Sequence, residues 1–375
     1  MKTVVERAKA YLKVRQQAVR EAMVKLNLDG LLLTSQADLS YLTNFTGDDS
    51  IGVITAKDFR LITDFRYQEQ ARIEAAWLKL TIRQGKMAPA VARVLVNANI
   101  KRVGFEANGT SFGEIHAINK ALADSGAKDT ELVPLENVLL NFRKVKDDTE
   151  IDLVRQSVGI GEEAYTAIRE EIKVGLSENY LAGLLGLELC SRGASGSSFP
   201  VIVAAGPNSS LPHHRPGETL VKRDQPLLID WGALYKGYCS DLTRTLIIGR
   251  VSPRLRRAYS AVLDAQTAAI EILRPGVLTR QADHVARDVI EKAGFGEQFG
   301  HGLGHGIGRE IHELPTLRKT GEEEELVPGM IVTVEPGIYL PGEGGVRIED
   351  DVLITHSGCE LLSSLDKTFE GCHLE

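Results

Sequence analysis

The chain has 375 residues, of which 43% are hydrophobic and 25% are charged, so it can bury a large core, most simply in two domains. Its formal net charge of −7 argues against a nucleic-acid or anionic-membrane target. The four cysteines form no CxxC pair, and no stretch reaches the roughly 18 apolar residues of a membrane span, so we expect a reduced, cytoplasmic protein.

The first half of the chain alternates between helical and strand-like patterns. Apolar residues recur at helical spacing in residues 2–27, and a short apolar run follows at residues 29–35. Four further strands are expected at residues 51–55, 60–64, 79–84 and 102–106, with helices around residues 66–76, 87–98 and 112–125. This alternation predicts an α/β domain, which ends near the polar stretch at residues 141–150.

The second half of the chain has a different pattern of helical and strand-like segments. Two helices are expected at residues 151–172 and 177–192. Strand-like segments then follow at residues 200–206, 226–235 and 238–249, with helices near residues 252–273 and 279–293. This pattern favours an α+β domain whose working surface is an antiparallel sheet.

Two glutamates near the C-terminus lie in apolar, strand-like runs. Glu335 and Glu349 are separated by a turn rich in proline and glycine at Pro341–Gly345. The pattern predicts a β-hairpin that directs two carboxylates inward. Two buried like charges are costly unless one carboxylate binds a proton or both bind a cation.

Two aspartates follow the same logic. Asp230 ends an apolar strand and Asp241 begins the next one, with Gly232 and Gly237 between them. A tight turn there would form a hairpin in which both carboxylates approach one point. Either aspartate alone could simply cap a turn, but the pair of glutamates makes a shared site the better interpretation.

The histidines gather in a glycine-rich segment. His301, His305 and His312 lie within residues 299–315, where four interspersed glycines disfavour a helix. An extended, glycine-rich backbone can approach a metal or substrate closely, and the segment matches neither a phosphate loop nor HExxH. His213 lies beside His214 in a loop, where a histidine is more often a plain surface residue.

The candidate ligand set contains four carboxylates and one imidazole: Asp230, Asp241, His305, Glu335 and Glu349. It is too rich in oxygen for a structural zinc site and suits Mn²⁺, Co²⁺ or a hydrolytic Zn²⁺. Two divalent cations would neutralise the four negative charges. Such a pair, about 3.5–4 Å apart, is a known device for activating water.

Four motifs carry a family resemblance: DWGALYKGYCSDLTRT, GHGLGHGIG, TVEPGIY and GGVRIEDD. In this order they closely resemble the metal-dependent pita-bread peptidases, which include Xaa-Pro aminopeptidase, prolidase and methionine aminopeptidase. In the first half, DGLLLTSQADLSYLTNFTG and LITDFRY resemble the N-terminal domain of the creatinase, aminopeptidase P and prolidase branch. The resemblance implies a creatinase-like α/β domain over residues 1–140 and a pita-bread α+β domain with a curved antiparallel sheet over residues 147–375.

The resemblance also implies metal-binding roles. Asp230 would bind one metal, His305 and Glu335 would bind the other, and Asp241 and Glu349 would bridge the two. A water or hydroxide between two divalent ions, Mn²⁺ in preference to Co²⁺ or Zn²⁺, would be the nucleophile. Glu335 would also act as general base.

Further residues would serve the substrate. His213 and His312 match the family's histidines that stabilise the tetrahedral intermediate, and His301 matches one that lines the pocket for proline. Arg347 would either contact the substrate or pair with a ligand carboxylate. Where relatives read LPHG, this chain has His213, His214 and Arg215, so either histidine could point inward, although His213 aligns better.

The implied activity is hydrolysis of the Xaa-Pro bond at the N-terminus of dipeptides or short peptides by a homodimer. The sequence does not separate a dipeptidase from an aminopeptidase on longer peptides, nor does it identify the preferred N-terminal residue. Three alternatives are a methionine-aminopeptidase-like enzyme, a creatinase-like amide hydrolase and a non-catalytic peptide-binding or protein-binding module. The extra N-terminal half disfavours the first, and the complete ligand set disfavours the other two.

Overall fold

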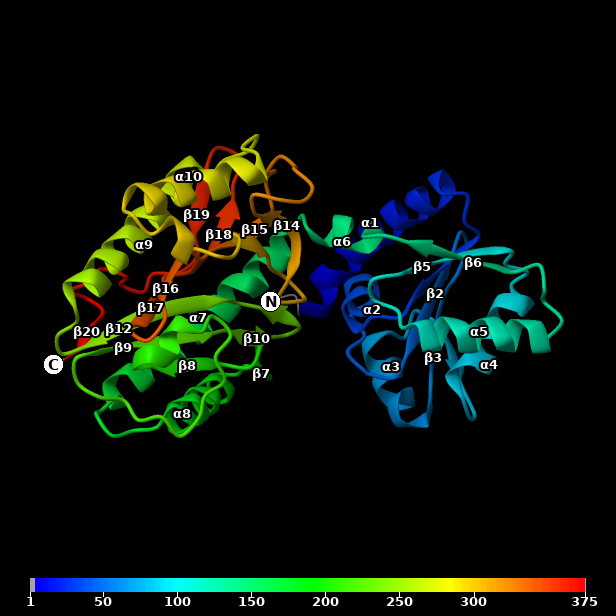
Figure 1. Cartoon of the computed structure of the whole chain (residues 1–375). Coiled ribbons are helices and arrows are strands. Elements are labelled where there is room, and N and C mark those ends of the chain that lie inside the picture. The colour runs from blue at the N-terminus through cyan, green and yellow to red at the C-terminus, as the bar shows by residue number, and fades with distance from the viewer. Residues whose placement is uncertain (1–3, 375) are drawn as a thin grey trace. The chain divides into compact units, whose positions relative to one another are not determined.

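The computed structural model describes residues 4–374, which divide into two compact units, one up to Phe142 and one from Arg143 onward. Figure 1 labels many of the helices and strands of both units. No helix within residues 4–374 is long and apolar enough to cross a membrane.

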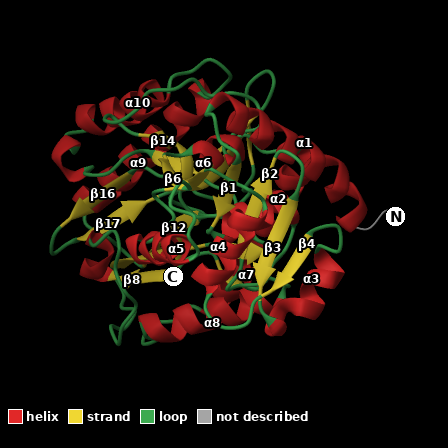
Figure 2. Ribbon diagram, turned by 90° about the vertical axis from the view of Figure 1, so that its right-hand side faces the viewer, coloured by secondary structure: helices red, strands yellow, loops and turns green. Residues whose placement is uncertain are grey.

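The first unit is a six-stranded mixed sheet with helices on both faces. Its strands lie in the order β4-β3-β2-β1-β5-β6, and Figure 2 shows β2, β3 and β4 side by side. The β1–β2 and β2–β3 pairs are antiparallel and the others are parallel. The strands are β1 Gly30–Leu33, β2 Ile51–Thr55, β3 Phe59–Thr63, β4 Lys79–Ile82, β5 Arg102–Glu106 and β6 Glu131–Leu135. The helices are α1 Val4–Lys25, α2 Gln36–Thr43, α3 Gln68–Glu74, α4 Met87–Asn97, α5 Phe112–Asp124 and α6 Val138–Arg143, with a 3₁₀ turn at Phe65–Tyr67.

The run of leucines in β1 explains why this sheet is covered on both sides. Side chains alternate between the faces of a strand. Leu31 and Leu33 pack into a core shared with α1, α2 and α3, whereas Leu32 packs into a second core with α4 and α5. A strand that is apolar at every position therefore requires two helical layers, which confirms the predicted α/β domain.

Within residues 143–374, the second unit consists mainly of antiparallel sheets and four long helices. Its helices are α7 Asp148–Glu171, α8 Glu178–Ser191, α9 Pro253–Ile272 and α10 Thr279–Lys292, with 3₁₀ turns η2 Gly206–Ser210 and η3 Gly296–Gln298. The first group of strands is β7 Gly196–Ser197, β8 Ile202–Ala205, β9 Gln225–Trp231, β10 Ala233–Tyr235, β11 Tyr238–Cys239 and β12 Leu242–Ile248. The second group is β13 Gly304–Gly306, β14 Glu313–Leu317, β15 Ile331–Val334, β16 Gly337–Leu340, β17 Gly344–Arg347, β18 Asp350–Ile354, β19 Cys359–Leu361 and β20 His373–Leu374.

Two of these sheets supply the surface on which the predicted ligands lie. One has the order β20-β12-β9-β8 and the other has the order β14-β13-β15-β18-β19. All their strand pairs are antiparallel except β12–β20, which confirms the predicted α+β domain. Both sheets and the helices α7 to α10 share one continuous hydrophobic core.

The hairpin between the two aspartates forms as predicted. Strands β9 and β12 pair so that Asp230 lies opposite Thr243. The connecting β10–β11 hairpin turns at Lys236 and Gly237, which both have positive φ, the geometry that a two-residue hairpin turn prefers. The turn thus returns the chain beside β9 and brings Asp241 toward Asp230.

The hairpin between the two glutamates also forms, but it is divided between two sheets. Its outer part is the β15–β18 pair and its inner part is the β16–β17 pair. The interruption contains Glu335 and Pro336 on one side and Ile348 and Glu349 on the other. Because Pro336 has no backbone N–H, it cannot continue the ladder, and both glutamates lie at the break.

Arg244 supports the same region from within the core. Its side chain is fully buried, pairs with Asp350 at 2.7 Å and donates to the carbonyl oxygen of Glu349 at 2.7 Å. We expect Arg244→Met to destabilise the fold by about 3–5 kcal/mol, because a buried carboxylate would lose its main partner. The matched control is Arg254→Ala at an exposed pair with Glu343, which should cost at most about 1 kcal/mol in chemical denaturation.

Candidate active site

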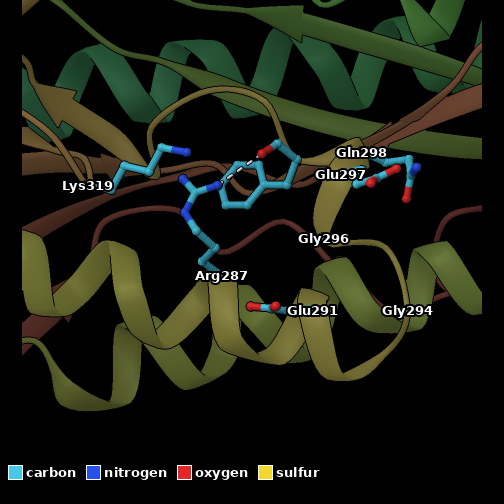
Figure 3. Close-up of a pocket in the computed structure, with 8 residues that line it drawn as sticks. Arg287, Glu291, Gly294, Gly296, Glu297, Gln298 and Lys319 are labelled. Carbon is cyan, nitrogen blue, oxygen red and sulfur yellow. Dashed lines mark hydrogen bonds between the residues drawn. The ribbon is translucent and has the colours of Figure 1, made fainter.

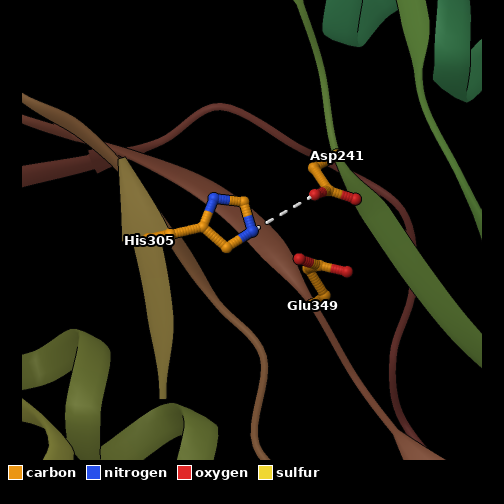
Figure 4. A group of neighbouring side chains, drawn as sticks. All are labelled: Asp241, His305 and Glu349. Atoms are coloured by element: carbon orange, nitrogen blue, oxygen red, sulfur yellow. Dashed lines mark ion pairs between the residues drawn. The ribbon is translucent and has the colours of Figure 1, made fainter. Parts of the chain in front are cut away.

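Five predicted ligands, from widely separated parts of the sequence, meet at one place in the second unit. The carboxylate of Asp241, the imidazole of His305 and the carboxylate of Glu349 offer ligand atoms that all lie within 4.8 Å of one another (Figure 4). His305 Nε2 lies 3.6 Å from Asp241 Oδ2 and 3.4 Å from Glu335 Oε1. Asp230 is joined to the group through Arg347.

Backbone pairing explains why the set converges. The glycines on either side of His305 allow β13 to pack tightly, since a Cβ on Gly304 would lie 2.0 Å from the Thr333 carbonyl oxygen. Glu349 forms an isolated backbone bridge with Thr243 of β12. This bridge connects the strand that follows Asp241 to the segment that holds Glu349.

The tautomer of His305 leaves a lone pair directed at the neighbouring carboxylates. His305 Nδ1 donates to the Gly306 carbonyl oxygen at 3.0 Å, so Nε2 presents a lone pair in the neutral ring. Burial, followed by the nearby His312, lowers the pKa of His305 to about 4. A lone pair that faces the carboxylates of Asp241 and Glu335 is repelled by them unless a proton or a metal cation lies between.

The pKa values of the four candidate ligand carboxylates are all raised. Burial raises the pKa of Asp241 well above its usual range, and the neighbouring carboxylates raise it further, Glu349 first. Burial and the charge of Glu335 do the same to Glu349. Burial raises the pKa of Glu335 to about 8, and it also raises that of Asp230 although Arg347 opposes the shift. Without cations, this cluster favours bound protons.

The donor set therefore fits divalent cations. Asp230 Oδ1 is buried and has no hydrogen-bond partner among the described residues, as a free ligand atom would. Oxygen donors dominate the set, with one imidazole nitrogen, which is the chemistry that Mn²⁺, Co²⁺ or hydrolytic Zn²⁺ accepts.

Arg347 is buried next to the candidate ligand Asp230. Its guanidinium pairs with Asp230 Oδ2, donates to the Thr243 hydroxyl at 3.2 Å and donates to the Tyr339 hydroxyl at 2.8 Å. Thr243 in turn donates to Glu349 Oε2 at 2.6 Å. Of its two predicted roles, pairing with a ligand carboxylate is the one for which this geometry provides a contact.

Tyr339 connects Arg347 to His301. His301 Nδ1 donates to the Gly302 carbonyl oxygen at 2.8 Å, so its Nε2 accepts the Tyr339 hydroxyl proton at 2.9 Å. Burial lowers the pKa of His301 to about 4, which keeps this ring neutral. Neither Tyr339 nor Thr243 was predicted as a site residue, although Tyr339 belongs to the TVEPGIY motif.

The remaining predicted histidines, His213 and His312, are both exposed. The His312 ring lies edge-on to the His305 ring, with 4.4 Å between their centroids. His213 is exposed, and its charge is close enough to lower the pKa of both Asp230 and His312, where burial is the larger influence. His214, by contrast, donates from Nε2 to Glu178 at 2.8 Å.

The segment that holds His301 is fixed by α10. Arg287 donates to the carbonyl oxygens of Phe299 at 2.9 Å and of His301 at 2.8 Å, and it pairs with Asp283 at 2.8 Å. Asp283 also accepts the Leu303 backbone N–H at 3.1 Å. Arg287 and Phe299 line a pocket of about 400 Å³, shown in Figure 3, which contains none of the predicted ligands.

Comparison with known proteins agrees with this architecture. Residues 152–356 match the model of metallopeptidase family M24, and residues 15–145 match that of the creatinase/prolidase N-terminal domain. The chain is 39% identical to the uncharacterized peptidase YqhT of Bacillus subtilis, over 92% of this chain and 96% of that protein. It is 32% identical to the Xaa-Pro dipeptidase of Pyrococcus horikoshii, again over 92% of this chain and 96% of the relative.

Solved structures show the same fold. A structure described as an Xaa-Pro dipeptidase from Bacillus anthracis superposes with a TM-score of 0.90 at 37% identity, over 95% of this chain and 99% of that one. A second, described as an X-Pro aminopeptidase from Thermotoga maritima, superposes with a TM-score of 0.84 at 34% identity, over 94% and 99%. The predicted creatinase-like and pita-bread architecture is thereby confirmed. The chain belongs to metallopeptidase family M24, in the group that carries a creatinase/prolidase N-terminal domain.

Proposed function

We propose that this M24 metallopeptidase is an exopeptidase that hydrolyses the Xaa-Pro bond at the N-terminus of dipeptides or short peptides, using two divalent metal ions. The convergence of three carboxylates, those of Asp241, Glu335 and Glu349, on the unprotonated Nε2 side of His305 is the observation that carries the proposal. The relatives described as an Xaa-Pro dipeptidase and an X-Pro aminopeptidase support the choice of substrate.

The proposed metal ligands are Asp230, Asp241, His305, Glu335 and Glu349, with Asp241 and Glu349 shared between two ions. We propose Mn²⁺ as the native ion, with Co²⁺ or Zn²⁺ as substitutes. When bound, the cations would supply charge that lowers the pKa of a water molecule and polarises the scissile carbonyl. Arg347 holds Asp230 in place through their ion pair and balances part of the negative charge of the site.

Glu335 is the proposed general base. Its side chain is 18% exposed, compared with 10% for Asp230 and 8% for Asp241. Of these three carboxylates, Glu335 is therefore the most accessible to a substrate. It would accept a proton from the attacking water and deliver it to the proline nitrogen. His213, His312 and His301 would bind the substrate side, the first two near the developing negative charge and the third beside the proline ring.

An Xaa-Pro bond needs such a dedicated site. Its amide nitrogen carries no N–H, and the residue before proline is conformationally restricted, so a peptidase that depends on that N–H binds it poorly. We further propose that the enzyme acts as a cytoplasmic homodimer. Sedimentation analysis of the purified protein would test the dimer.

The deciding experiment compares metal-stripped protein with and without Mn²⁺ on an Xaa-Pro dipeptide and an Xaa-Pro-Yaa tripeptide. We expect Mn²⁺-dependent cleavage of at least one, and no cleavage of matched peptides with alanine in place of proline. Cleavage of the dipeptide alone identifies a dipeptidase, and cleavage of the tripeptide alone identifies an aminopeptidase. If neither proline peptide is cleaved by metal-loaded protein, the proposed substrate is wrong, and N-terminal methionine peptides and other amides become the next candidates.

A further inference from the structure

A second buried carboxylate lies outside the candidate metal site. Glu178 is the first residue of α8, and its side chain is fully buried. Oε1 accepts from the backbone N–H of Ala205 at 2.8 Å and from Asn208 Nδ2 at 2.9 Å. Oε2 accepts from His214 Nε2 at 2.8 Å and from the backbone N–H of Gly217 at 3.0 Å. Both oxygens therefore have two donors each.

All four donors lie close together in the sequence. One is the last residue of β8, and the other three belong to the loop segment of residues 206–217 that follows it. Ala205 immediately precedes the loop, Asn208 lies in its 3₁₀ turn, and Gly217 lies further along the connection to β9. The backbone of α8 adds a further contact, since the Asn179 N–H donates to the Gly217 carbonyl oxygen at 3.0 Å. One buried carboxylate thus connects several separate points of this loop to α8.

The charge of Glu178 is what makes this arrangement possible. Burial raises the pKa of Glu178, but the hydrogen bonds from Ala205, Asn208, His214 and Gly217 outweigh it and leave the pKa below its usual range. An ionised carboxylate only accepts hydrogen bonds. His214 must therefore carry its proton on Nε2, and this nitrogen is committed to Glu178 and cannot contact a substrate.

The adjacent residue in the loop, His213, has the opposite environment. It is exposed, and it lies close enough to Asp230 and His301 in the candidate site to influence the pKa of each, although burial dominates both. Leu211 to His214 form a tight turn, which is closed by the hydrogen bond from the His214 N–H to the Leu211 carbonyl oxygen at 3.1 Å and contains His213. A contact that draws the His214 ring toward Glu178 therefore constrains the direction of the His213 ring.

We infer that Glu178 is a positioning residue, which holds the loop of residues 206–217 through four hydrogen bonds so that His213 faces the substrate. The inference rests on the proposed function, in which His213 stabilises the transition state. In this chain, the His214 side chain supplies one of the four bonds. The hydrogen bond from His214 to Glu178 keeps the His214 side chain out of the substrate site.

The test is Glu178→Gln, which replaces one acceptor oxygen by an NH₂ group that faces two donors. We expect kcat to fall about 10- to 100-fold, because a shift of about 1 Å in a catalytic group has this effect. KM should remain nearly constant, since His213 acts mainly in the transition state. The matched control is Asn179→Ala, which removes only an exposed side-chain bond to Glu218 and should leave kcat unchanged.

Two readouts separate positioning from a general loss of structure. In a double-mutant cycle with His213→Ala, Glu178→Gln should have almost no additional effect on kcat, because both changes remove the same contribution. Hydrogen exchange should become faster in peptides that cover residues 205–217, with unchanged metal content and unchanged exchange in α10. Fully additive losses in the cycle, or unchanged exchange in the loop, would overturn the inference.

A milder pair of variants applies if Glu178→Gln does not fold. His214→Gln keeps a donor in place and should retain activity, whereas His214→Leu removes it and should lower kcat and accelerate exchange in the loop. Equal activity of the two would overturn the role of His214. Absence of Xaa-Pro cleavage by the wild-type enzyme would instead refute the proposed function, so the two failures are distinguishable.

Discussion

Removal of divalent cations is expected to abolish peptidase activity and to make the protein less stable as the pH rises. Burial raises the pKa of all four candidate ligand carboxylates, that of Glu335 to about 8. The unfolded chain has carboxyl pKa values of about 4, so the metal-free folded state binds more protons than the unfolded state between pH 4 and pH 8. Its stability is therefore greatest below about pH 4 for these groups and is lost as the pH rises toward 8.

Thermal unfolding of chelated protein between pH 5 and pH 8, with and without added Mn²⁺, measures this effect. The difference between the two Tm values should grow with pH, because bound cations replace the protons and bind only the folded state. Titratable groups elsewhere contribute equally to both curves and cancel in the difference. A difference in Tm that is constant across this range would contradict the proposed site, as would full peptidase activity after chelation.

The candidate ligands could be predicted because each one lies at a local signal. Asp230 and Asp241 flank a hairpin marked by glycine, and Glu335 precedes a proline that interrupts a strand. Local periodicity and turn residues determine such features, so they are visible without a structure. The interruption between β15 and β16, which contains Glu335, was not foreseen, nor was the matching interruption between β17 and β18, which contains Glu349.

Contacts between residues far apart in the sequence could not be predicted from local patterns. Glu178 and His214 are 36 positions apart, and no pattern along the chain indicates that their side chains meet. The edge strand β6 was also missed, and it contains Pro134, a residue that is uncommon within strands. The structure explains the exception, because a strand with only one neighbour, β5, needs fewer backbone N–H donors.

Glu335→Gln is expected to lower kcat and kcat/KM together by about 10²–10⁴-fold, the usual contribution of a general base. The amide cannot accept a proton, yet it has nearly the same size as the carboxylate. Its oxygen can still accept the hydrogen bond from the Thr333 hydroxyl, which Glu335 Oε1 accepts at 3.3 Å. The variant should therefore fold, and KM should change little.

Metal content decides between the two proposed roles of Glu335. If the variant binds both ions and is inactive, Glu335 acts mainly as the base, whereas loss of one ion shows that it acts mainly as a ligand. Glu343→Gln is the matched control, because Glu343 is 38% exposed and pairs only with the exposed Arg254 among the described residues, and it should be as active as the wild type. Near-normal activity of Glu335→Gln with both ions bound would rule out both roles. Among the four candidate ligand carboxylates, a new search for the base would then begin with Asp230, whose Oδ1 has no hydrogen-bond partner within residues 4–374.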